Sequence, residues 1–177
     1  MTHQPFAQFD DYRSELALYA AVLLAVPVAF GHLQGLQNQL LVGTLVNAVL
    51  FVAARRFSAW KILVPLAVVP SIGAWLSGIV FGIDSKFLLY FLPAIWIANL
   101  LFMKLVKLTT GKKTWKTLVF PSVAKAVFLF ATALFLVSLN AVPSLFLIAM
   151  GPLQLATALT GSFAGLLGVA YLYNRGR

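Results

Sequence analysis

Hydrophobic residues in this 177-residue chain gather in six long runs that short polar stretches separate. A helix needs about 20 apolar residues, with a range of roughly 17–25, to cross the hydrocarbon core of a bilayer. The pattern therefore predicts an all-α membrane protein with a single transmembrane domain over residues 1–177, built as a six-transmembrane-helix bundle. The predicted helices cover residues 16–30, 40–54, 60–81, 87–103, 118–139 and 145–173.

The last run is too long for one upright span, because residues 145–173 would form about 43 Å of helix at 1.5 Å per residue. It contains Gly151 followed by Pro152. Proline removes one backbone donor and its ring clashes with the preceding turn. We therefore expect this helix to tilt strongly or to break at Gly151-Pro152.

Positive charges follow the same alternation, since 11 of the 13 lysines and arginines lie near a chain end or in every second connection. Basic connections stay in the cytoplasm during insertion, which predicts a multi-pass protein of the cell membrane with both termini cytoplasmic (N-in, C-in). We attribute the net charge of +9 to this bias and to anionic membrane lipids, and expect no nucleic-acid partner. The residues are Arg13, Arg55, Arg56, Lys61, Lys104, Lys107, Lys112, Lys113, Lys116, Arg175 and Arg177.

Composition argues against catalysis. The mean hydropathy is +0.96 and only 10% of residues are charged. The chain has no cysteine, and its two histidines, His3 and His32, fall on opposite sides of the predicted membrane. We therefore expect no catalytic residue, no metal site and no cofactor. The four acidic residues, Asp10, Asp11, Glu15 and Asp84, lie outside the predicted membrane interior.

Small residues recur along the first predicted helix. Ala17, Ala21, Ala25 and Ala29 are spaced by four and so form one ridge of the helix. A ridge of methyl groups allows close approach of another backbone, which is a main source of helix association in lipid. The stripe is either a docking surface for a separate partner or an internal packing surface. We assign Gly161 and Gly165, and the similar pair Gly78 and Gly82, to internal packing.

Lys125 is the one charge that the pattern places inside a span, about 10 Å into the fifth helix at 1.5 Å per residue. A lysine at mid-membrane costs at least about 2.5 kcal/mol. Three interpretations remain open: the stem reaches the interface, the ammonium has a partner within the bundle, or it contacts a ligand. No acidic residue lies within a predicted span, which argues against a proton-coupled carrier.

Uncharged polar residues provide further candidates for binding a solute. Asn47 and Gln154 fall near mid-membrane, and Asn99 nearer the cytoplasmic end of its helix. Amides suit a small polar solute, but they also link helices to one another. Trp96 offers a surface for stacking or simply packs. The amide-rich connection 31–39, which includes His32 and Gln34, is either a lid over an outer pocket or an ordinary turn.

These features resemble the substrate-binding S components of energy-coupling factor (ECF) transporters. The resemblance covers the whole chain and is carried by residues 150–161 (MGPLQLATALTG), by residues 93–99 (PAIWIAN), by Lys125 and by the alanine stripe. It implies a subunit that captures a vitamin or similar micronutrient from outside. The subunit then docks on a transmembrane scaffold subunit that two cytoplasmic ATPase subunits drive.

The same resemblance implies roles for individual residues. Ala17, Ala21, Ala25 and Ala29 would be the docking stripe, and Asn99, Trp96 and Gln154 would belong to the pocket. The metal-binding relatives begin with Met-His, whereas Thr2 precedes His3 here, so no metal site is transferred. Two alternatives stay open: a ligand-free membrane scaffold or assembly protein, and a small self-sufficient channel or carrier.

Overall fold

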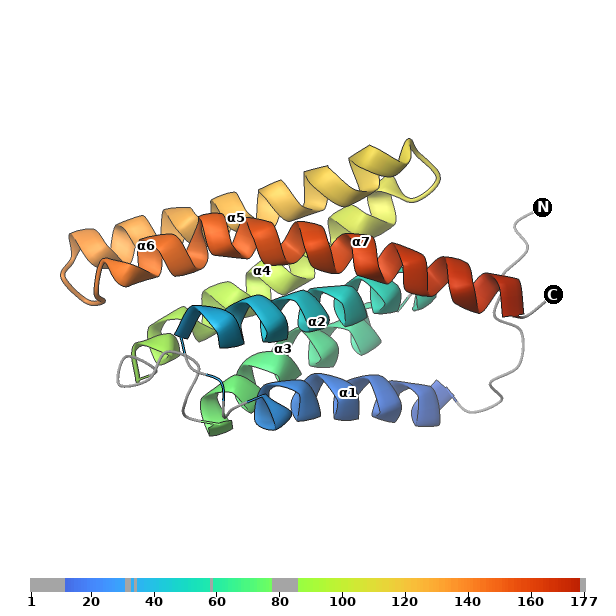
Figure 1. Ribbon diagram of the computed structural model, residues 1–177, viewed down its shortest axis with the longest axis horizontal. Coiled ribbons are helices and arrows are strands. Elements are labelled where there is room, and N and C mark those ends of the chain that lie inside the picture. Colours follow the sequence, from blue (N-terminus) through green and yellow to red (C-terminus); the bar gives the residue numbers. More distant parts are fainter. Residues whose placement is uncertain (1–11, 31–32, 34, 58, 78–85, 176–177) are drawn as a thin grey trace.

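The computed structural model describes residues 12–30, 33, 35–57, 59–77 and 86–175, and it is all-α, with no strand among them. The long axes of its helices run roughly side by side (Figure 1). The helices are α1 (Tyr12–Ala29), α2 (Gly35–Arg56), α3 (Trp60–Ser77), α4 (Leu88–Thr109), α5 (Thr114–Ser138), α6 (Leu145–Met150) and α7 (Pro152–Arg175).

Apolar length is compatible with a membrane-embedded protein. Within the described ranges, four stretches are long and apolar enough to cross a bilayer, and Trp60–Trp75 is a shorter apolar helix. Large hydrophobic side chains cover the outside of the bundle; Leu18, Val127 and Phe135, for example, are more than 60% exposed. The four spans are Gln37–Arg56, Leu88–Thr109, Thr114–Ser138 and Leu145–Tyr171.

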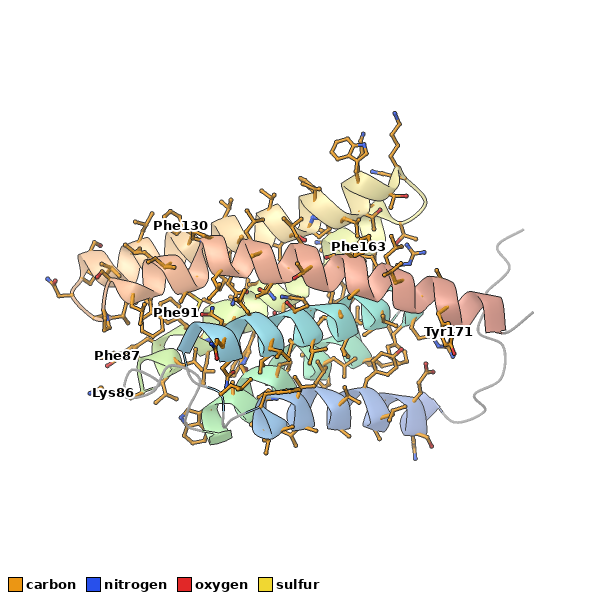
Figure 2. All side chains as sticks on the ribbon, viewed as in Figure 1. Lys86, Phe87, Phe91, Phe130, Phe163 and Tyr171 are labelled. Atoms are coloured by element: carbon orange, nitrogen blue, oxygen red, sulfur yellow. The ribbon has the colours of Figure 1, made fainter. Side chains whose placement is uncertain are left out.

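The two ends of the bundle differ in charge. The start of α1 and the end of α7 lie at one end, together with the α2–α3 and α4–α5 connections (Figure 1). Nearly all described lysines and arginines belong to this end, which we name the basic end. Lys86 lies at the opposite end, beside Phe87 (Figure 2). The alternation of charge along the sequence is thus a separation of charge in space.

The predicted helices match the observed ones in order, but two boundaries change the depth of key residues. α4 continues past residue 103 to Thr109, and α5 begins at Thr114 rather than at residue 118. Basic and polar residues extend both helices beyond their apolar runs, so periodic hydrophobicity alone underestimates their length. Asn99 and Lys125 consequently lie near the middle of their helices, and not toward one end as predicted.

The last apolar run is broken where the sequence indicates. α6 ends at Met150 and α7 begins at Pro152, with Gly151 in a non-helical conformation between them (φ −103°, ψ −100°). A Cβ at Gly151 would lie 2.6 Å from Phe130 Cδ2 and 2.8 Å from the Leu147 carbonyl oxygen. Glycine therefore allows α5 to pack directly against the break.

Small residues bring α2 and α7 into close contact. A Cβ at Gly161 would lie 2.6 Å from both the Asn47 Cβ and the Thr44 carbonyl oxygen, and one at Gly165 would lie 2.9 Å from the Ala48 carbonyl oxygen. The internal packing predicted for this glycine pair is confirmed. The pair Gly78 and Gly82 lies outside the described residues.

Helix α1 packs on the edge of the bundle, mainly against α3, and lies on the side away from α5 and α6 (Figure 1). Leu23 and Pro27 are buried in this contact, and a Cβ at Gly73 of α3 would lie 3.0 Å from the Leu24 carbonyl oxygen. The opposite face of α1 points outward. Its exposed residues include the whole alanine stripe, Ala17, Ala21, Ala25 and Ala29.

An ion pair fixes the basic end of α1. Arg56 Nε of α2 donates to Glu15 Oε1 at 2.7 Å, and both side chains are largely buried. The Tyr19 ring meets the Phe57 ring edge to face, with centroids 5.3 Å apart. These contacts hold α1 against α2 without using the alanine stripe.

We predict that Gly161→Val strongly destabilises the bundle, because the new side chain collides with the α2 backbone and with Asn47. Overpacking of this kind costs about 1–3 kcal/mol or more. Thermal unfolding of the purified protein in detergent measures the effect. The matched control is Gly168→Val, since a Cβ at Gly168 has its nearest neighbour at 3.9 Å. Equal melting temperatures for the two variants would contradict the close α2–α7 contact.

Candidate functional site

A cavity of about 100 Å³ lies inside the bundle. Its wall is mainly apolar, with six polar side chains spaced around it. Apolar walls with a few well-placed polar groups are typical of sites for small molecules. The lining residues are Gln39, Val42, Gly43, Val46, Asn47, Pro70, Ser71, Ala74, Leu88, Ile95, Asn99, Lys125, Leu129, Met150 and Gln154.

The cavity lies in the half of the bundle away from the basic end. Its lining comes from the first half of α2, the last turns of α3, the first half of α4, the middle of α5 and the residues beside the break between α6 and α7. Most of these segments lie toward the end of the bundle opposite the start of α1 and the end of α7 (Figure 1). Every described helix except α1 contributes at least one lining residue. The alanine stripe and the cavity therefore occupy separate parts of the molecule.

Lys125 of α5 forms the polar centre of the cavity. Its Nζ donates to Asn47 Oδ1 of α2 and to Asn99 Oδ1 of α4, each at 2.7 Å. The ammonium also lies 5.4 Å from the centroid of the Phe102 ring, a distance at which the ring face attracts a cation. The side chain is only 3% exposed. Of the three interpretations open from the sequence, the structure supports the partner within the bundle and excludes a stem that reaches the interface.

Each acceptor is itself held in place. Asn99 Nδ2 donates to the Ala67 carbonyl oxygen of α3 at 2.8 Å, which fixes which amide atom faces Lys125. Asn47 Nδ2 lies 3.5 Å from Thr157 Oγ1 of α7, and the Asn47 Cβ rests against Gly161. Hydrogen bonds to a charged group contribute about 1.5–3 kcal/mol each, enough to offset the cost of placing a lysine at mid-bundle.

Gln39 at the start of α2 is a site residue that the sequence did not single out. Its Nε2 donates to the Ala149 carbonyl oxygen at 2.6 Å, next to the α6–α7 break. Its Oε1 is buried and, among the described residues, has no hydrogen-bond partner. The residue belongs to the amide-rich stretch 31–39, which the sequence predicts to be a connection between two helices. Helix α2 begins within this stretch, however, at Gly35, and Gln39 thereby lies inside the bundle.

The structure brings together most of the predicted pocket residues. Asn47, Asn99, Lys125 and Gln154 all line the cavity. Trp96 does not: its Nε1 donates to Ser71 Oγ at 2.6 Å, and the serine is the lining residue. Trp96 therefore supports the wall from behind, through its hydrogen bond to Ser71. His32 and Gln34 lie outside the described residues.

The described part of the chain contains no group of three or more histidine, cysteine, aspartate or glutamate side chains that could hold a metal ion. Comparisons with protein-family models, with curated proteins and with solved structures find no match for this chain. The functional argument therefore rests on the geometry of the cavity and of α1.

We predict that Asn99→Ala lowers the free energy of unfolding by about 1–3 kcal/mol, because the ammonium of Lys125 and the Ala67 carbonyl each lose a buried partner. In a Lys125→Met background the same change should cost less, since no buried charge then loses an acceptor. The coupling, about 0.5–3 kcal/mol for groups in one network, is measurable from thermal unfolding of the four proteins.

The matched control for this cycle is Thr132→Ala. The Thr132 hydroxyl donates at 3.0 Å to the Phe128 carbonyl of its own helix, farther along α5 than Lys125. Its effect should be the same with or without Lys125. Additive effects of Asn99→Ala and Lys125→Met would contradict a shared network.

Proposed function

We propose that this chain is the solute-binding subunit of an ECF-type importer, an S component in the membrane of the cell. In this proposal the chain crosses the membrane six times and both termini are cytoplasmic, so that the basic end faces the cytoplasm. Solute capture is its own task, and ATP hydrolysis belongs to two other subunits.

The position of the cavity supports the capture of a solute from outside. With the basic end in the cytoplasm, as the charge bias favours, the half of the bundle that holds the cavity is the outer half. A polar centre surrounded by apolar walls at that depth suits one small molecule. A wall drawn from six helices of the described chain leaves little reason to regard the cavity as a packing defect.

The observation that carries the proposal is the separation of this cavity from the outward face of α1. The alanine stripe is exposed although small residues in membrane helices usually serve close packing. Leu18, Val22 and Val28 flank it as exposed apolar residues. A scaffold subunit that docks along this ridge would contact α1 without touching the residues that line the cavity.

The two alternatives are favoured less. A ligand-free scaffold would need the exposed ridge, but it gives no role to a cavity with a buried ammonium and a free amide oxygen. A self-sufficient carrier would transport its solute when this chain alone is placed in liposomes. The proposal expects transport only with the scaffold and ATPase subunits and with ATP.

We predict that the protein purified from its native membrane retains a small solute. Mass spectrometry of a methanol extract identifies the compound, and the same compound added to stripped protein raises the melting temperature. A ligand at a hundredfold excess over Kd contributes about 2.7 kcal/mol. An extract without any specific compound, together with no thermal shift from a panel of vitamins and related nutrients, would contradict solute capture.

We predict that replacing Ala21 and Ala25 by Leu abolishes uptake by cells and co-purification of the scaffold subunit, because bulky side chains hold the two backbones apart. Binding of the solute by the purified variant should stay unchanged. The matched control replaces Ala131 and Ala164 by Leu, since both are exposed alanines on α5 and α7. Loss of solute binding in the α1 variant, or equal uptake by both variants, would refute the docking assignment.

A further inference from the structure

When protonated, Lys125 holds a positive charge that no carboxylate among the described residues balances, and only the face of the Phe102 ring adds to its two hydrogen bonds. Both of its hydrogen-bond acceptors, Asn47 and Asn99, are neutral amides. Glu15 carries the one side-chain carboxylate among the described residues, and it pairs with Arg56 at the basic end. Dipoles soften the cost of a buried charge, but an opposite charge offsets it far better.

The ammonium also keeps one donor for a ligand. A lysine ammonium has three N–H donors, and the two amide oxygens occupy two of them. Lys125 lines the cavity, together with the two asparagines that hold it. A ligand in the cavity thus meets an oriented cation that requires an acceptor, and the asparagines keep that cation in place before the ligand arrives.

A second polar atom of the cavity points to a further group on the ligand. Gln39 is 5% exposed, and its Nε2 is committed to the Ala149 carbonyl. Its Oε1 has no partner among the described residues, although a buried acceptor without a donor costs about 1–3 kcal/mol. The amide group cannot rotate by 180° to bring Oε1 to a donor without breaking the hydrogen bond from Nε2 to the Ala149 carbonyl. A ligand N–H or O–H would satisfy Oε1.

The volume of the cavity and the apolar side chains of its wall further limit which class of ligand fits. The volume of about 100 Å³ is somewhat below the roughly 150 Å³ cavity that holds a benzene molecule. Between the polar groups the wall is made of aliphatic side chains such as Val46, Ile95 and Leu129. The body of the ligand is therefore compact and apolar, with its polar groups at defined points.

We propose that the cavity binds a compact organic monoanion, a carboxylate that carries at least one N–H or O–H donor. The carboxylate accepts from Lys125 and supplies its missing counter-charge, and the donor bonds Gln39 Oε1. This inference rests on the proposed function and adds the chemical class of the solute. A cationic solute would meet an ammonium at the centre of the cavity, and a neutral solute would leave that charge unbalanced.

The first test compares acids with their neutral amides on the stripped protein in detergent. The probes are glycolate and glycolamide, lactate and lactamide, and 3-hydroxypropanoate and 3-hydroxypropanamide. We expect at least one acid to raise the melting temperature by roughly 5–10 °C at a hundredfold excess over its Kd. We expect its amide to leave the temperature unchanged, because only the acid neutralises Lys125.

Two variants assign that shift to the site. Lys125→Met should abolish the shift from the acid, whereas Lys116→Met, which removes an exposed lysine from the same helix, should preserve it. Shifts from amides that equal those from acids, shifts from none of the acids, or a shift that survives Lys125→Met would each overturn the inference.

The second test builds the counter-charge into the chain and needs no ligand. Asn47→Asp replaces an amide oxygen 2.7 Å from Lys125 Nζ with a carboxylate oxygen. The Thr157 hydroxyl, which donates to the Gln154 carbonyl at 3.2 Å, can turn to donate to the other carboxylate oxygen. We expect this nearly isosteric variant to melt at a higher temperature than the wild-type protein and to lose the shift from the acid. In the Lys125→Met background the same change should lower the melting temperature, because the new carboxylate is then buried alone.

A lower melting temperature for Asn47→Asp in the presence of Lys125 would overturn the proposed need for an anion. This outcome is separable from failure of the transporter assignment. If an amide binds tightly while the acids do not, the solute-binding role stands and the anionic class is wrong. If an acid binds as expected but no scaffold subunit co-purifies, the anionic class stands and the importer assignment is wrong.

Discussion

The buried ammonium of Lys125 constrains the centre of this bundle more than any other group. In an apolar environment, a donor of that group that has no acceptor raises the free energy of the folded protein by several kcal/mol. The acceptors come from α2 and α4, so that the charge ties three helices together across the bundle. Helix positions that would separate these groups are therefore disfavoured, and the two hydrogen bonds orient the three side chains before any ligand enters the cavity.

Backbone proximity makes this arrangement possible. Gly161 lets α7 approach α2 until the Asn47 Cβ rests on the glycine, which directs the asparagine side chain toward α5. Gly43, one helical turn earlier on α2, meets Thr157 in the same way, since a Cβ at this glycine would lie 3.0 Å from the threonine side chain. The break at Gly151-Pro152 then leaves the Ala149 carbonyl for Gln39. Small residues thus position polar ones, and Gly43 and Asn47 belong both to this contact and to the wall of the cavity.

The sequence predicted the helices, a strong tilt or a break at Gly151-Pro152, and four of the six polar residues that line the cavity, because each has a local signal. Long apolar runs, a Gly-Pro pair and polar residues within a span can be recognised in the sequence without knowing which residues are neighbours in space. It did not predict that Lys125 meets Asn47 and Asn99, since those contacts join α5 to helices far away along the chain. Gln39 was missed because helix α2 starts inside a polar stretch. Trp96 was placed in the pocket because its hydrogen bond to Ser71 of α3 has no signal in the sequence.

In the proposed importer, the separation of α1 from the cavity limits how solute binding and docking can be linked. The described lining of the cavity contains no α1 residue, so a solute cannot change the exposed ridge by direct contact. α1 rests mainly on α3, and α3 supplies Ser71 and Ala74 to the cavity wall and Gly73 to the α1 contact. In the proposed importer, helix α3 is the main contact between the cavity wall and α1, and helix α2 is the second, through the ion pair of Arg56 with Glu15.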